Sequence, residues 1–111
     1  MNVTVNYKIV DNRLPEIIAK VPGLVSAAVK KTAFDIETDA KQFSPVDTGT
    51  LQGSISAEVE EFSAAIAPHT EYAGYVEFGT WKMGAQPYMR PAADKNAPKF
   101  EAAITEILSS L

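Results

Sequence analysis

Apolar and small residues recur at steps of three and four over one long stretch of the chain. This stripe comprises Leu24, Val25, Ala28, Val29, Thr32, Ala33, Ile36, Ala40 and Phe43. Lysine, glutamate and aspartate side chains occupy the opposite face, so the pattern predicts an amphipathic helix of about five turns. Ser44 and Pro45 end this helix, because the residue before a proline is pushed out of the α region.

Two further stripes predict shorter helices on either side of the long one. The C-terminal stripe comprises Phe100, Ala103, Ile104, Ile107, Leu108 and Leu111. We expect Pro98 in the first turn of this helix, or at a kink in a longer helix that begins near Pro91. The earlier stripe covers residues 14–21, and Pro22-Gly23 interrupts or kinks it.

Strict alternation of apolar and polar residues marks the expected strands. Residues 3–9 alternate with β-branched side chains, and residues 55–59 and 64–67 predict a hairpin after a short helical turn at 51–55. The chain therefore predicts one α+β domain over residues 1–111. In it, the long amphipathic helix and the C-terminal helix pack on a small antiparallel β-sheet.

Two turns are rich in residues that fix backbone shape. In the first, Pro45, Asp47, Thr48, Gly49 and Thr50 provide a helix stop, an Asx turn, a positive φ angle and a cap. In the second, Tyr72, Tyr75, Val76 and Gly79 predict a short helix with one aromatic face. We expect Gly79 to end that helix as a left-handed C-cap.

Charge and composition narrow the functional classes. The formal net charge is −4, whereas a module that reads DNA sequence is expected to be basic. We therefore expect no sequence-specific nucleic-acid binding. No apolar run approaches the length of a membrane span, and the N-terminus lacks the pattern of a secretory signal, so we expect no membrane partner. The absence of cysteine excludes disulfide and thiolate chemistry.

Catalytic interpretations find little support. The triplet at 47–49, Asp-Thr-Gly, also occurs in retroviral-type aspartic proteases, where two subunits each supply one carboxylate. Such an aspartate sits in a β-rich fold, whereas Asp47 follows a long helix, so the protease is the least favoured alternative. His69 is the single histidine, and we expect a solvated loop residue. A serine–histidine pair stays open, but we expect no catalytic residue, cofactor or metal.

Two groups of residues predict contacts within or between chains. Glu77 and Arg90 each lie in apolar surroundings along the sequence, and we expect them to form a bidentate ion pair. Trp81, Met83, Tyr88 and Met89 crowd one loop. Large apolar side chains in a loop either fold back on the core or bind a partner, so these four are candidates for a subunit interface.

Three runs in order carry a resemblance to a known family. They are SPVDTGTL at 44–51 with Ser54-Ile55, YAGYVEFGT at 72–80 and AQPYMRPA at 85–92. In this combination the chain resembles the siphophage neck and tail-component family, which comprises small virion proteins of long-tailed phages. The chain departs from the family pattern at Gln52, where arginine is frequent, and at Tyr88, where phenylalanine is usual.

The resemblance implies a non-enzymatic structural protein at the head–tail junction of a bacteriophage or prophage. It implies self-association into a ring, contacts with adjacent connector and tail proteins, and a place in the virion after assembly in the host cytoplasm. A generic protein-interaction or adaptor module is the alternative, since it would share the same fold logic without assembling into a ring.

Overall fold

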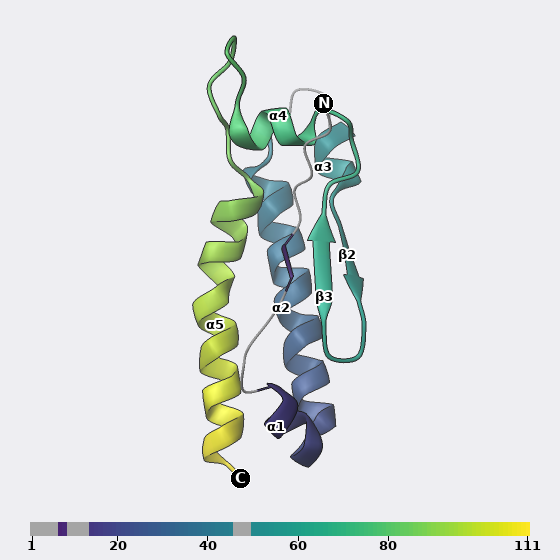
Figure 1. The fold of residues 1–111 in the computed structure, drawn as a ribbon, viewed down its shortest axis with the longest axis vertical. Helices are drawn as coiled ribbons and strands as arrows, with labels where there is room; N and C mark the ends of the chain where they lie inside the picture. Colours follow the sequence, from purple (N-terminus) through teal and green to yellow (C-terminus); the bar gives the residue numbers. More distant parts are fainter. Residues whose placement is uncertain (1–6, 9–13, 46–49) are drawn as a thin grey trace.

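The structure, a computed structural model, describes residues 7–8, 14–45 and 50–111 and arranges them in three layers (Figure 1). The elements are β1 (Tyr7–Lys8), α1 (Leu14–Lys20), α2 (Pro22–Phe43), α3 (Thr50–Ser54), β2 (Ser56–Val59), β3 (Ala64–Ala67), α4 (Ala73–Phe78) and α5 (Met89–Ser109). Helix α2 forms the middle layer, with α5 along one side and the β2–β3 hairpin along the other. The α+β fold and the packing of the two long helices with a small antiparallel sheet are as the sequence predicts.

Helix α2 supplies the centre of the core. It buries Val25, Val29, Thr32, Ala33, Ile36 and Ala40. Pro22 lies in its first turn and separates it from α1, as the sequence predicts. Ser44 is extended at φ −70° and ψ 146°, so the helix ends where Pro45 requires. The expected apolar stripe is too wide, because Leu24 is 52% exposed and Phe43 is 40% exposed.

Helix α5 is one continuous helix of 21 residues that runs antiparallel along α2 (Figure 1). Its buried stripe consists of Met89, Ala92, Asn96, Phe100 and Ile104. Pro98 lies inside the helix and on its exposed face. Solvent can therefore satisfy the carbonyl group that a proline at this position leaves without its helical partner. Of the two expected positions for Pro98, the longer helix is the one observed.

The sheet is antiparallel in the order β1-β3-β2. Ser56 pairs with Ala67 and Val59 with Ala64, while Tyr7 of β1 pairs with Ile66. Ile66 is completely buried, since it faces the helical layer. The predicted hairpin is therefore present; of the predicted strand at 3–9, only Tyr7 and Lys8 fall within the described residues.

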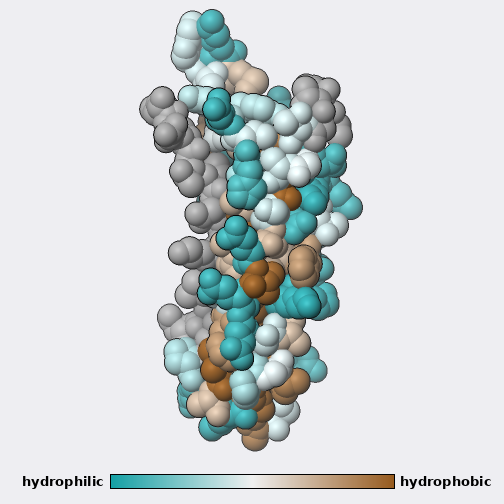
Figure 2. All heavy atoms as spheres, turned by 90° about the vertical axis from the view of Figure 1, so that its right-hand side faces the viewer, coloured by the Kyte–Doolittle hydropathy of each residue, from teal (hydrophilic) through white to brown (hydrophobic). Residues whose placement is uncertain are grey.

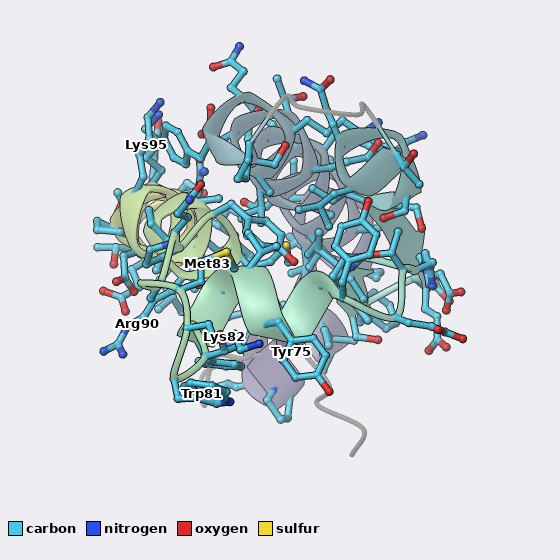
Figure 3. All side chains as sticks on the ribbon, turned by 90° about the horizontal axis from the view of Figure 1, so that it is seen from above. Tyr75, Trp81, Lys82, Met83, Arg90 and Lys95 are labelled. Atoms are coloured by element: carbon cyan, nitrogen blue, oxygen red, sulfur yellow. The ribbon has the colours of Figure 1, made fainter. Side chains whose placement is uncertain are left out.

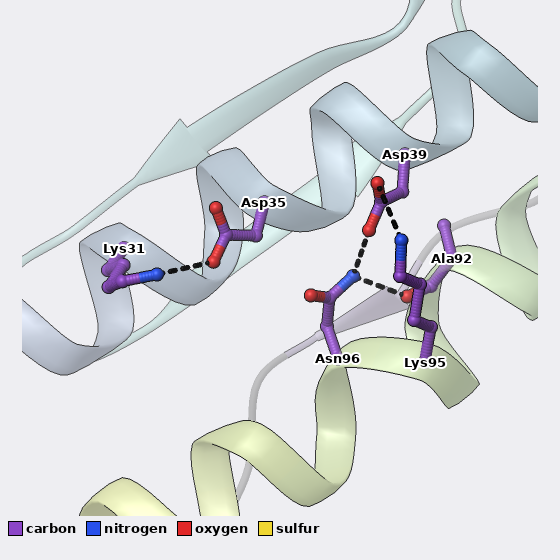
Figure 4. Close-up of polar contacts among 6 residues, drawn as sticks. All are labelled: Lys31, Asp35, Asp39, Ala92, Lys95 and Asn96. Atoms are coloured by element: carbon purple, nitrogen blue, oxygen red, sulfur yellow. Dashed lines mark hydrogen bonds and ion pairs between the residues drawn. The ribbon is translucent and has the colours of Figure 1, made fainter.

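A polar cluster joins the last turns of α2 to α5 (Figure 4). Nδ2 of Asn96 donates to Oδ2 of Asp39 and to the carbonyl oxygen of Ala92, both at 2.8 Å. Nζ of Lys95 lies 3.3 Å from Oδ1 of Asp39. The hydrogen bond from Asn96, followed by the bond and charge of Lys95, lowers the pKa of Asp39 below its usual value although burial opposes the shift. This directional contact fixes how α5 is aligned along α2.

The Asp39 cluster predicts a pH-dependent stability. Because the pKa of Asp39 is lower in the folded chain than in the unfolded one, its carboxylate stabilises the fold above the unfolded pKa. That contribution is lost as pH falls through the folded pKa. We expect Asp39→Asn to lower the free energy of unfolding at pH 7, and the gap to the parent chain to narrow towards pH 3. Urea unfolding at several pH values measures it; a gap that stays constant with pH would contradict the assignment.

Candidate protein-interaction site

Residues 80–87, here called the arm, connect α4 to α5 and project beyond the rest of the molecule (Figure 1). Every side chain from 81 to 87 is exposed, and Trp81 is 89% exposed. Met83 is 41% exposed, and Phe78 at the base of the arm is 62% exposed. Viewed from above, Trp81, Lys82 and Tyr75 project to the same side of the molecule, while Met83 lies on the inner side of the arm (Figure 3).

Gly79 sets the direction in which the arm leaves α4. Its φ of 78° and ψ of 175° belong to a region that is essentially restricted to glycine. A Cβ atom here would lie 2.7 Å from the backbone nitrogen of Ala85. The second half of the arm therefore passes too close to residue 79 for any side chain there. The N–H group of Gly79 donates to the Tyr75 carbonyl at 2.8 Å, which places it at the C-cap of α4. Its ψ angle is extended, in contrast to the expected left-handed helical conformation.

Backbone hydrogen bonds hold the arm in one shape. Thr80 N–H donates to Met83 O at 2.8 Å, and Met83 N–H donates to Thr80 O at 3.3 Å. At the base, Gln86 N–H donates to Val76 O at 2.8 Å. The arm is therefore a preorganised loop that carries an exposed aromatic side chain.

The Glu77 carboxylate anchors the far end of the arm to α4. Glu77 is only 4% exposed. Its Oε1 accepts hydrogen bonds from the N–H groups of Tyr88 at 3.2 Å and Met89 at 2.8 Å, and its Oε2 accepts one from Arg90 N–H at 3.4 Å. These are unpaired donors at the start of α5, where the helix dipole also favours a negative charge. Glu77 therefore caps α5 from another helix.

The expected ion pair between Glu77 and Arg90 is not formed. The guanidinium of Arg90 lies on an exposed side chain and its Nε is 3.7 Å from Asp94, four residues further along α5. Glu77 contacts Arg90 only through the backbone N–H group. The sequence contained a signal for this contact: no Ser, Thr, Asp or Asn precedes Met89 to cap α5, so a buried carboxylate from elsewhere could take that place.

Tyr88 and Met89 do not belong to the exposed surface that the sequence predicted. Both are completely buried in the core. Tyr88 Oη donates to the Ala73 carbonyl at 3.0 Å, and burial followed by the charge of Glu77 raises the pKa of this phenol. The expected short helix is present as α4, and the residues that it buries are Ala73, Gly74 and Glu77, so its aromatic side chains are not the buried ones. Of the four candidate interface residues, the surface retains Trp81 and Met83.

Two of the remaining candidate residues flank other elements of the fold. Pro45 follows α2 and Thr50 begins α3. Asp47, Thr48 and Gly49 lie outside the described residues. The described residues form an α+β fold, which differs from the β-rich fold that the protease alternative requires.

Ser56 and His69 form the serine–histidine contact that the sequence left open. Ser56 Oγ lies 2.9 Å from His69 Nε2, and His69 N–H donates to Ser54 Oγ at 3.1 Å. These bonds tie the start of β2 to the segment after β3. In the described ranges, no cluster of three His, Cys, Asp or Glu side chains could hold a metal ion, and no helix is long and apolar enough to span a membrane.

Removing the Glu77 carboxylate is expected to destabilise the fold. Glu77→Ala leaves buried N–H donors without an acceptor, so we expect a loss of roughly 2–3 kcal/mol in the free energy of unfolding. Arg90→Ala is the matched control, since an exposed side chain usually contributes less than about 0.5 kcal/mol. Urea unfolding measures both. Equal losses for the two variants would favour an ion pair and contradict backbone capping.

Comparison of the sequence with known protein families gives a match. A family model described as "Bacteriophage HK97-gp10, putative tail-component" matches residues 11–79. The match covers α1 to α4 and ends at Gly79, where the arm begins. Searches of curated proteins and of solved structures gave no significant match. Because the matched segment is more than half of the 111 residues, the chain belongs to the HK97-gp10-like family of bacteriophage tail components.

Proposed function

We propose that this tail component is a non-enzymatic structural protein of the head–tail junction. In this proposal it associates with copies of itself in a ring and binds adjacent connector or tail proteins. It is located in the host cytoplasm during assembly and becomes part of the virion. The observation that carries the proposal is the preorganised arm with Trp81 at 89% exposure.

An exposed tryptophan on an ordered loop suits protein recognition. Aromatic residues and methionine are enriched at interface centres, and tryptophan is frequent among the residues that contribute most to binding. The arm carries the exposed side chains of Trp81 and Met83, and the exposed Phe78 lies at its base. Its hydrogen bonds fix the loop before binding, so little conformational freedom is lost when it docks.

A second apolar surface lies at the opposite end of the molecule. Leu24 is 52% exposed and Leu111 is 53% exposed, at the start of α2 and at the end of the chain. Figure 2 shows hydrophobic side chains gathered at this lower end, whereas the arm projects at the top. Separate surfaces at the two ends suit a protein that contacts more than one neighbour in a stack.

Three polar side chains support a structural role, since each is bonded within the fold. Glu77 caps α5, Tyr88 donates to the Ala73 carbonyl, and the partly buried Asp39 joins α2 to α5. An adaptor module would share these features. A ring component differs because its arm must contact a copy of the same chain or an adjacent virion protein.

Trp81→Ser tests the proposal. We expect the variant to fold normally, with the free energy of unfolding within about 0.5 kcal/mol of the parent chain, because the side chain is exposed. We expect it to fail to support particle assembly when it replaces the parent gene in the phage or prophage. Infectious titre and electron microscopy of the particles measure this.

Phe34→Ser is the matched control. Phe34 is 45% exposed on the outer face of α2, so its replacement removes a surface aromatic residue away from the arm. We expect this variant to assemble like the parent chain. Normal particles with Trp81→Ser would show that the arm is not an assembly contact.

A further inference from the structure

The proposed self-association requires a surface that receives the arm, and the structure offers one on the β2–β3 hairpin. A cleft of about 180 Å³ is lined by Glu58, Glu60, Ser63, Ala64 and Ala65. A water molecule takes up roughly 30 Å³ of liquid volume, so the cleft has room for a group as large as a side chain. Ala65 is partly exposed and its small side chain leaves space in this cleft, whereas Ala64 is only 3% exposed. The exposed Glu58 and Glu60 bring negative charge to it.

The arm presents a group that matches this cleft in chemistry. Lys82 Nζ lies 4.9 Å from the centre of the Trp81 ring, so a flat apolar surface and a positive charge are held together. Trp81 would contact Ala65, and Lys82 would lie near Glu58 and Glu60. A charge near opposite charges at a partly desolvated contact also steers the partner into the correct orientation.

The distribution of charge along the chain supports the same pairing. Residues 42–81 contain six acidic residues and no lysine or arginine; the six are Asp47, Glu58, Glu60, Glu61, Glu71 and Glu77. Residues 82–99 contain four basic residues and one acidic residue, Asp94; the four are Lys82, Arg90, Lys95 and Lys99. The arm and the first half of α5 are therefore basic, whereas the hairpin is acidic.

The arm and the β2–β3 turn, whose flanking residues line the cleft, lie in different parts of the molecule. In Figure 1 the arm rises at the upper left, beyond α4, while the turn between β2 and β3 lies at the lower right. The molecule is 52 Å along its longest axis, and the arm of a chain does not reach its own cleft. Each copy thus carries one docking group and one receiving surface, which is the condition for a heterologous contact that repeats from copy to copy.

We propose that the arm of each copy docks in the cleft of the next copy, with Trp81 and Lys82 against Glu58 and Glu60. This inference rests on the proposed self-association and identifies the two surfaces that meet in it, the arm and the cleft. It differs from a symmetric contact between two arms, because the surfaces that meet are different.

Mixing two variants separates these possibilities. Trp81→Ser removes the arm contact, and Glu58→Lys with Glu60→Lys reverses the charge of the cleft. We expect each variant alone to show a dissociation constant for self-association raised about tenfold or more over the parent chain. Together they should form a pair of one copy each and nothing larger, because one intact arm meets one intact cleft. Analytical ultracentrifugation measures the sizes, and circular dichroism verifies folding. Replacing both glutamates with glutamine is the milder second variant.

The other outcomes are distinct. If the charge-reversed variant associates like the parent chain while Trp81→Ser does not, the arm binds elsewhere and this inference fails, while the proposed self-association stands. If Trp81→Ser also associates like the parent chain, the arm is not the contact and this inference fails, while the proposed self-association stands. If the parent chain itself does not associate, the proposed self-association fails. If the two variants do not pair when mixed, the contact is not between arm and cleft.

A disulfide trap tests the geometry even where association is weak. The chain has no cysteine, so an introduced pair reports only its own contact. Gly84 has open space around its Cβ position, and Ser63 lines the cleft. We expect the variant Gly84→Cys with Ser63→Cys to form a ladder of linked oligomers on oxidation. Gly84→Cys with Ser109→Cys, at the end of α5, should not. The absence of a ladder in the first, or equal ladders in both, would overturn the inference.

Discussion

The capping of α5 by the Glu77 carboxylate is the contact on which the architecture around the arm depends. The first N–H groups of a helix have no partner inside the helix, and Tyr88, Met89 and Arg90 supply three such donors at a buried site. A charged acceptor satisfies them more strongly than a neutral one. Because Glu77 belongs to α4, this contact also joins the two ends of the segment that contains the arm.

The arm owes its shape to this closure. Gly79 turns the chain out of α4, Gln86 N–H returns to Val76 O, and Glu77 receives the chain again at Met89. The exposed residues between these points are consequently held on a short base. An exposed loop with fixed ends can present Trp81 in one orientation, whereas a free loop would have to be ordered on binding.

Much of the fold could be predicted from the sequence, and the reason is periodicity. The stripes around Val29 and Ile104 and the alternation before Ala67 follow from burial on one face, which is a local property. The partner of Glu77 could not be predicted in the same way, since it depends on which helix end lies beside α4. The sequence pattern placed Tyr88 and Met89 in the loop for a related reason. Where α5 begins is not evident from the sequence, so the first residues of that helix resemble the end of the preceding loop.

The burial of Tyr88 and Met89 also changes what the interface can do. With these two residues in the core, the large apolar side chains that the arm exposes are Trp81 and Met83. Two side chains are too few to cover the roughly 800 Å² per partner of a standard stable interface. A single arm contact should therefore be weak between two isolated chains. In a ring, each copy makes the same contact twice, and a docking platform raises the effective concentration of its neighbours. A small preorganised arm thus suits a component that stays dispersed until the particle gathers its copies.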